Sequence, residues 1–215
     1  MPSILSKHER QTTIDKANKG DASAQFKLGG MYQFGNGVRR DYLEAIMWYT
    51  KAAEQGYASA QFSLGEIYYN GDGVPQDYNE AIKWCTKAAE QGDASAQSLF
   101  GEMYYYGKGI PKDYDEAVKW FTKAAEHRNA SAQTLLGEMY YFGRSVPKDY
   151  NEAYKWALLA EMNGETGGIH KALKEMLADK ITPTQIAEAH KLAREFTEKQ
   201  EKEKTEKNTK ASGEK

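Results

Sequence analysis

Few residues in this chain have the types and spacing that metal binding requires. The four histidines, His8, His127, His170 and His190, are scattered without zinc-ligand spacing, and the single cysteine, Cys85, lies far from them in sequence. We therefore expect no metal site, no cofactor and no internal disulfide. Cys85 is interpreted as a small apolar filler of the core.

The residues also argue against catalysis. One Ser-x-x-Lys match, Ser145-Val146-Pro147-Lys148, has the spacing in which β-lactamases and penicillin-binding proteins hold a serine nucleophile near a lysine. It falls in a proline-containing turn, which cannot hold the lysine one helical turn from the serine, and Lys-Thr-Gly is absent. Glycine-rich turns at 35–37 and 71–73 lack the Lys-Ser/Thr of a phosphate-binding loop. The sequence predicts that the chain is not an enzyme.

Tryptophan and proline recur at one fixed interval. All four tryptophans lie 36 residues apart, and four of the five prolines keep the same spacing: Trp48, Trp84, Trp120 and Trp156; Pro75, Pro111, Pro147 and Pro183. A period of this length indicates a repeat array. We expect four units, 20–55, 56–91, 92–127 and 128–163. The tryptophans should form a structural ladder, because burying one Trp is worth about 2–3 kcal/mol.

Each unit reads as helix, turn, helix. In the second unit the apolar residues of 60–68 recur at helical spacing and predict a first helix, helix A. Gly71-Asp72-Gly73-Val74 predicts a turn, and Asp77-Tyr78-Asn79-Glu80 predicts a capping box that opens a second helix, helix B. This box occurs in all four units. Asp21, Asp93 and Asn129 are expected to cap helix A of the other units, whereas Tyr57 cannot cap the second.

The two ends differ from the middle of the array. Residues 1–19 are predicted to be an N-terminal capping helix with a polar face, and residues 164–198 a degenerate C-terminal capping helix pair. From residue 199 to 215, Lys and Glu alternate without apolar anchors. We expect this segment to be a frayed helix or a disordered tail.

Composition excludes other classes of protein. The formal net charge is −2 and the pI near 6.1, so the basic excess of nucleic-acid binders is missing. No apolar run approaches the roughly 18 residues of a membrane span. The N-terminus turns charged before any apolar stretch develops and does not read as a secretory signal. We expect a cytoplasmic monomer, with non-classical export left open.

The second unit carries a recognisable motif. Its residues Ala60, Leu64, Gly65, Tyr68, Gly71, Gly73, Val74, Asp77, Ala81, Trp84, Ala88 and Ala89 match a spaced pattern that recurs in four tandem copies. The pattern resembles the Sel-one-like repeat (SLR) family, relatives of the tetratricopeptide repeats. The resemblance implies an all-α fold, a right-handed α/α superhelix of four 36-residue helix-turn-helix repeats with capping helices at both ends.

The resemblance also implies a function. Members of the family act as non-enzymatic adaptors or scaffolds that bind proteins or peptides in a concave groove lined by helix A. Some cysteine-rich relatives are described as penicillin-binding or β-lactamase-like, but they carry a disulfide in each repeat, which this chain lacks. A structural or self-associating spacer, with contacts through the ends or the convex face, is the other alternative.

Two columns of side chains are the candidate groove residues. One is acidic, and the other pairs two neighbouring, mostly aromatic positions: Gly30, Glu66, Glu102 and Glu138; Gln33, Tyr69, Tyr105 and Tyr141 beside Phe34, Asn70, Tyr106 and Phe142. Carboxylates beside aromatic rings suit a peptide carrying Lys or Arg. The alternative is that these residues only keep the solenoid soluble and packed. We expect the three glutamates to be exposed.

Overall fold

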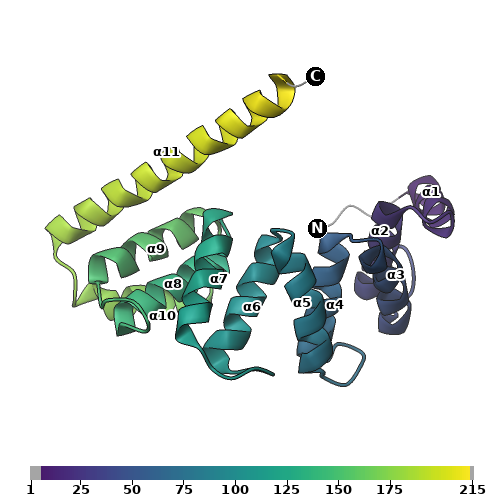
Figure 1. Ribbon diagram of the computed structural model, residues 1–215, viewed down its shortest axis with the longest axis horizontal. Helices are drawn as coiled ribbons and strands as arrows, with labels where there is room; N and C mark the ends of the chain where they lie inside the picture. Colours follow the sequence, from purple (N-terminus) through teal and green to yellow (C-terminus); the bar gives the residue numbers. More distant parts are fainter. Residues whose placement is uncertain (1–5, 214–215) are drawn as a thin grey trace. The chain divides into compact units, whose positions relative to one another are not determined.

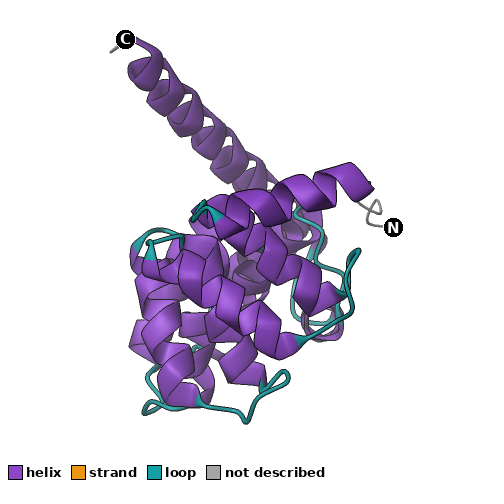
Figure 2. Cartoon of the chain, turned by 90° about the vertical axis from the view of Figure 1, so that its right-hand side faces the viewer, coloured by secondary structure: helices purple, strands orange, loops and turns teal. Residues whose placement is uncertain are grey.

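The computed structural model describes residues 6–213, and all of their regular secondary structure is helical (Figure 2). The helices are α1 (Lys7–Asn18), α2 (Ala22–Phe34), α3 (Tyr42–Glu54), α4 (Ala58–Asn70), α5 (Tyr78–Glu90), α6 (Ala94–Tyr106), α7 (Tyr114–Glu126), α8 (Ala130–Phe142), α9 (Tyr150–Met162), α10 (Gly168–Ala178) and α11 (Pro183–Gly213). The predicted all-α fold of tandem helix-turn-helix repeats is confirmed. Helices α2 to α9 are helices A and B of the four repeats in turn.

The chain forms two compact units, Met1–Lys112 and Asp113–Lys215. In the first, α2 pairs with α3 and α4 with α5, while α1 packs on α2 and α6 on α5 (Figure 1). In the second, α8 pairs with α9, α7 packs on α8, and α10 and α11 pack on α9. The helices of the third predicted repeat therefore belong to different units.

The predicted helix caps form, with one correction. Oδ1 of Asp21, Asp93 and Asn129 accepts the N–H three residues ahead, and Tyr57 makes no side-chain cap. The aspartates that open helix B also accept two N–H bonds each, but the glutamates do not close the box. Instead the N–H of Asp77 donates to Tyr68 O at 2.9 Å, and Glu80 pairs with Lys83 at 2.9 Å. A backbone partner from helix A has displaced the glutamate.

Non-glycine residues hold two turns in the left-handed conformation. Arg128 (φ 60°) takes the position that Gly20, Gly56 and Gly92 hold in the sequence of the other repeats. Ser145 (φ 55°) takes the position of the second glycine of the A–B turn. The turn geometry is kept in both places. The cost is borne by the backbone, since a side chain in this conformation is unfavourable by roughly 1–2 kcal/mol.

In the first unit, Trp48 and Trp84 connect their hairpins to the helix before, whereas Trp120 of the second unit is half-buried. Trp48 packs with Ala17 of α1 and with α2, while Trp84 packs with Ala45 and Tyr49 of α3 and with α4. Trp48, Trp84 and Trp156 are all at most 8% exposed. One ring thus buries surface from three helices at once.

A ladder of glutamines, which the sequence did not predict, reinforces these contacts. Gln25 and Gln61 each donate from Nε2 to the carbonyl eight residues back, at 3.2 and 3.0 Å. Their Oε1 atoms accept from Gln55 and Gln91, thirty residues on, at 2.7 Å in both cases. In the second unit Gln133 makes the same pair of bonds, with Ala125 O and Asn163. Each of these amides therefore joins the ends of the helices before and after a helix A to the start of that helix A.

The N-terminal helix begins with a complete capping box. Glu9 N donates to Ser6 Oγ at 3.2 Å, and Ser6 N donates to a carboxylate oxygen of Glu9 at 2.9 Å. The Arg10 guanidinium donates to the carbonyl of Gly37 in the first A–B turn. These contacts fix α1 to the first repeat. Residues 1–5 of the predicted cap lie outside the described residues.

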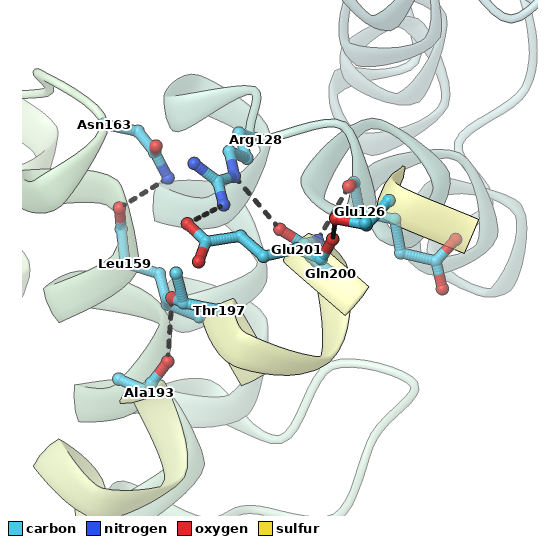
Figure 3. A network of polar contacts seen from close by, with 9 residues as sticks. Glu126, Arg128, Leu159, Asn163, Ala193, Thr197, Gln200 and Glu201 are labelled. Carbon is cyan, nitrogen blue, oxygen red and sulfur yellow. Dashed lines mark hydrogen bonds and ion pairs between the residues drawn. The ribbon is translucent and has the colours of Figure 1, made fainter. Parts of the chain in front are cut away.

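The C-terminal helix α11 lies along α9. Phe196 meets Trp156 with ring centroids 5.2 Å apart. Further on, Arg128 donates to Gln200 at 3.3 Å and to Glu201 at 3.1 Å, and Gln200 donates to Glu126 O at 2.7 Å (Figure 3). The left-handed Arg128 therefore holds α11 against the α7–α8 turn.

Residues 199–213, expected to be a frayed helix or a disordered tail, continue α11 as a helix. Lys199 and Glu203 pair at 3.9 Å, four residues apart, and the hydroxyl of Thr205 donates to Glu201 O at 2.8 Å. Lys and Glu favour helix, and extending a helix already nucleated against α9 is far less costly than starting one. Residues 214 and 215 lie outside the described residues.

Candidate functional site

The acidic column is not exposed, contrary to the prediction. Glu66, Glu102 and Glu138 are half-buried on α4, α6 and α8. Burial disfavours a charged carboxylate and raises the pKa of each, for Glu102 to about 7. The neighbouring Asp72 carboxylate raises the pKa of Glu66 further. The side chains that pack around each glutamate decide this burial, and a single-helix pattern does not show them.

The aromatic column separates into packed and exposed positions. Tyr105 is only 4% exposed, and the half-buried Tyr69 and Tyr141 lie against Tyr78 and Tyr150, with centroids 5.6 and 5.4 Å apart. The adjacent positions face solvent, and Phe34 is the most exposed of the large apolar residues among them, at 66%. The exposed set is Phe34, Asn70, Tyr106 and Phe142. These four, and not the tyrosines beside them, can offer their side chains to a partner.

In the first unit, helix-A residues line a cleft of about 740 Å³, here called the α1–α4 cleft. The structure brings four candidate positions together there: Gly30, Gln33, Phe34 and Glu66. The capping helix α1 adds His8, Glu9, Thr12 and Thr13, which the sequence analysis had not included. The cleft thus combines apolar surface with two carboxylates.

Tyr49 is a cleft residue that sequence analysis missed. Its hydroxyl donates to Gln33 Oε1 at 2.6 Å, and burial chiefly raises its pKa to about 12, so it stays a phenol. Its ring fills the space beside Gly29, where a Cβ would come within 2.6 Å of it. Comparing the repeats could have found it, because Tyr49 stands where later repeats have Cys85, Phe121 and Ala157, and Gly30 and Gln33 change with it.

In the second unit, an arginine of the chain itself contacts residues of both the acidic and the aromatic column. Arg144 Nη1 lies 3.5 Å from Glu138 Oε1, and its guanidinium carbon lies 4.6 Å from the ring centroid of Phe142 and 5.6 Å from that of Tyr114. A carboxylate and two rings around one guanidinium are the contacts that the sequence analysis expected a basic peptide to make.

The side chains considered for catalysis or metal binding, Ser145, Lys148 and Cys85, are not arranged as a reactive site. The Lys148 ammonium lies over the rings of Tyr141 and Tyr150, at 5.9 and 5.2 Å, while Ser145 lies in an exposed turn. Cys85 is fully buried, which chiefly raises its pKa to about 12 and keeps it a thiol. Within the described part of the chain, no three His, Cys, Asp or Glu side chains are grouped as metal ligands. No described helix has the length and apolarity of a membrane span.

Several solved structures are similar to this chain. A Sel1 repeat protein from Oxalobacter formigenes shares 35% identity over 88% of this chain and 79% of its own, with a TM-score of 0.73. A protective antigen with an SLR fold, from uropathogenic Escherichia coli, shares 31% identity over 88% of this chain (TM-score 0.56), which spans about half, 48%, of the antigen. An immunity protein from Pseudomonas aeruginosa, 18% identical over 91% of this chain and 76% of its own, shares the fold with a TM-score of 0.54.

Two further comparisons used the sequence. The comparison with curated proteins finds no match. The family model for the Sel1 repeat matches four consecutive segments, 22–57, 58–93, 94–129 and 130–165, which together make up about two thirds of the chain. These segments coincide with the four hairpin repeats to within two residues. The chain therefore belongs to the Sel1 repeat family.

Proposed function

We propose that this chain is a non-enzymatic scaffold that binds a segment of another protein, of basic character, in the α1–α4 cleft. Sel1 repeat proteins are typically protein-interaction scaffolds, and their solenoid fold is generally not that of an enzyme. The coarse function thus follows from the family. The binding face and the character of the partner are the proposal.

One observation carries the proposal: a cleft of about 740 Å³ has an exposed phenylalanine and an unpaired carboxylate among its lining residues. Phe34 offers an apolar surface that a bound segment would cover. Among the described residues, the Glu66 carboxylate forms neither an ion pair nor a hydrogen bond. Burying the ring stabilises a complex, and the carboxylate favours a basic partner.

A photo-crosslinking experiment tests the choice of face. The photoreactive residue p-benzoylphenylalanine replaces Phe34 in one variant and Leu43 in another, and both are exposed to an extract of the native source. Leu43 is a matched control because it is also 66% exposed, but on α3 outside the lining of the cleft. We expect cross-linked protein from position 34 only.

Two other outcomes contradict the proposal. Cross-linking from position 43 alone would place the interaction on the outer face of α3, as the spacer alternative expects. Cross-linking to a second copy of the chain would indicate self-association. Phe34→Ala should also lower capture of the partner about tenfold while leaving the melting temperature unchanged, since so exposed a ring adds little to folding.

A further inference from the structure

The α1–α4 cleft has charges that favour one kind of partner side chain. Its lining carries the carboxylates of Glu9 and Glu66 against the single ammonium of Lys27, and Asp72 lies close enough to Glu66 to raise its pKa. Glu9 is already held by the capping box at Ser6. Glu66 is therefore the carboxylate that remains for a ligand.

The second unit shows what the same repeat positions bind. Glu138 and Phe142 lie one turn apart on α8, with the guanidinium of Arg144 against both. Glu66 and Phe34 occupy the same positions of their repeats, but on two helices, α4 and α2, whose side chains line one cleft. The residue at the Arg144 position is Asn36 in the first repeat and Asp72 in the second. Neither can supply the cation. The α1–α4 cleft thus has a carboxylate and a ring, on two different helices, without an arginine at this position of either repeat.

We propose that the α1–α4 cleft binds an arginine side chain of the partner, with Glu66 receiving its guanidinium and Phe34 lying against its flat face. This inference rests on the proposed function and names the partner residue that enters the cleft. Arginine fits better than lysine because its planar fork bonds a carboxylate and stacks on a ring at the same time. Gly30 leaves room for the head group where later repeats carry a glutamate.

Peptide titration tests the inference. The probe is acetyl-Gly-Arg-Gly-amide, followed by chemical-shift changes in backbone amides of the whole chain. The matching peptides carry lysine, or citrulline, which has the shape of arginine without its charge. We expect the arginine peptide to shift resonances around Phe34 and Glu66, the lysine peptide to bind several-fold more weakly, and the citrulline peptide not to bind.

Two variants make the test specific. Glu66→Gln should weaken the arginine peptide about tenfold or more, since a charged hydrogen-bond partner is lost. Glu90→Gln, on an exposed position of α5, should have no effect. Arg144→Ala should create a second site, because Glu138 and Phe142 lose the guanidinium that occupies them. The peptide should then shift the resonances of α8, which it leaves unmoved in the wild type.

The inference is overturned if lysine and arginine peptides bind equally, if Glu66→Gln binds like the wild type, or if the Arg144→Ala variant gains no site on α8. Absence of any shift in the cleft up to the solubility of the peptide overturns it as well. A cross-link from position 34 in the same protein would then show that the proposed function stands and only the arginine is wrong. Loss of both would remove the cleft as the binding site.

Discussion

Two adjacent glycines in α2 have opposite structural roles. A Cβ on Gly29 would lie 2.6 Å from the Tyr49 ring, whereas a Cβ on Gly30 would meet only the Tyr49 hydroxyl, at an ordinary 3.5 Å. Both have helical backbones, in which glycine is less favourable than alanine by about 1 kcal/mol. The first is kept glycine by close packing, and the second leaves space in the cleft.

These roles predict opposite effects of one substitution. Gly29→Ala should lower the free energy of unfolding by about 1–3 kcal/mol, because the ring must move, while Gly30→Ala should raise it by about 0.5–1 kcal/mol. Urea denaturation of the two variants measures both. Gly30→Glu, which restores the residue of later repeats, should keep the stability and abolish cross-linking from position 34. Equal destabilisation by both alanines would contradict the assignment.

Glu102 should make stability depend on pH. Its pKa is about 7 in the folded chain, against an ordinary 4.5, so between these values the folded state binds a proton that the unfolded state has released. Stability should therefore fall as pH rises from about 4.5 to 7 and stay lower above it. Glu102→Gln removes the ionisation. It should be more stable than the wild type at pH 8, by roughly 1–3 kcal/mol, and equally stable at pH 4.

Thermal melts at the two pH values measure this difference, with the exposed Glu90→Gln as the control. If the stability difference between Glu102→Gln and the wild type is the same at pH 8 as at pH 4, the carboxylate ionises in the folded chain without cost. Such a result would indicate that water reaches Glu102 in solution.

At the scale of elements, the A–B turns tolerate a residue that does not suit them. Ser145 holds the left-handed conformation that Gly37, Gly73 and Gly109 hold in the other repeats. Ser145→Gly should therefore stabilise the chain by about 0.5–1 kcal/mol. It relieves the strain of a side chain in this conformation, and this gain exceeds the loss from the greater entropy of glycine in the unfolded state. Chemical denaturation measures it. A loss of stability would mean that the serine side chain contributes to the turn more than its backbone strain costs.

Helix α11 depends on a change in α9 that can be read in the sequence. Earlier helices B place a lysine over the tryptophan ring, as Lys51 does over Trp48 at 4.1 Å. In α9 the position of this lysine is taken by Leu159, and the threonine before it by Leu158; both leucines are at most 8% exposed, and Phe196 of α11 meets Trp156. Without the lysine of earlier repeats at position 159, the Trp156 ring is met by a ring of α11.

Phe196→Ala should weaken this attachment by about 2 kcal/mol, a half-buried ring being worth less than the 3–5 kcal/mol of a fully buried one. Hydrogen exchange of the α11 amides should become faster by more than tenfold. The exposed Arg194→Ala, on the same helix, is the control. Unchanged exchange in Phe196→Ala would show that the Arg128 contacts hold α11 without the ring.

At the scale of the whole molecule, stability should be local, as in other repeat arrays, because each repeat contacts mainly its neighbours. Gly29→Ala should accelerate hydrogen exchange most in α2 and α3, less in α4 and α5, and least in α8 and α9. Exchange followed by mass spectrometry gives this gradient. A uniform increase over all helices would show instead that the chain unfolds as one cooperative body.

The sequence by itself determined the helices, the hairpins and their register. Period, caps and turn glycines are local signals, so the tryptophan ladder and the caps at Asp21 and Asn129 could be read without a structure. Even the missing cap at Tyr57 was predictable. The family followed from the same residues.

Tertiary structure alone decided which helix faces are open. A single-helix pattern placed Glu66, Glu102 and Glu138 on the solvent side, but neighbouring helices half-bury them and raise their pKa values. The α1–α4 cleft, the Tyr49–Gln33 bond and the seating of Arg144 on Glu138 join residues that are distant in the chain or lie on different helices. Burial and pairing of this kind depend on what packs opposite, and a repeat period carries no information about that.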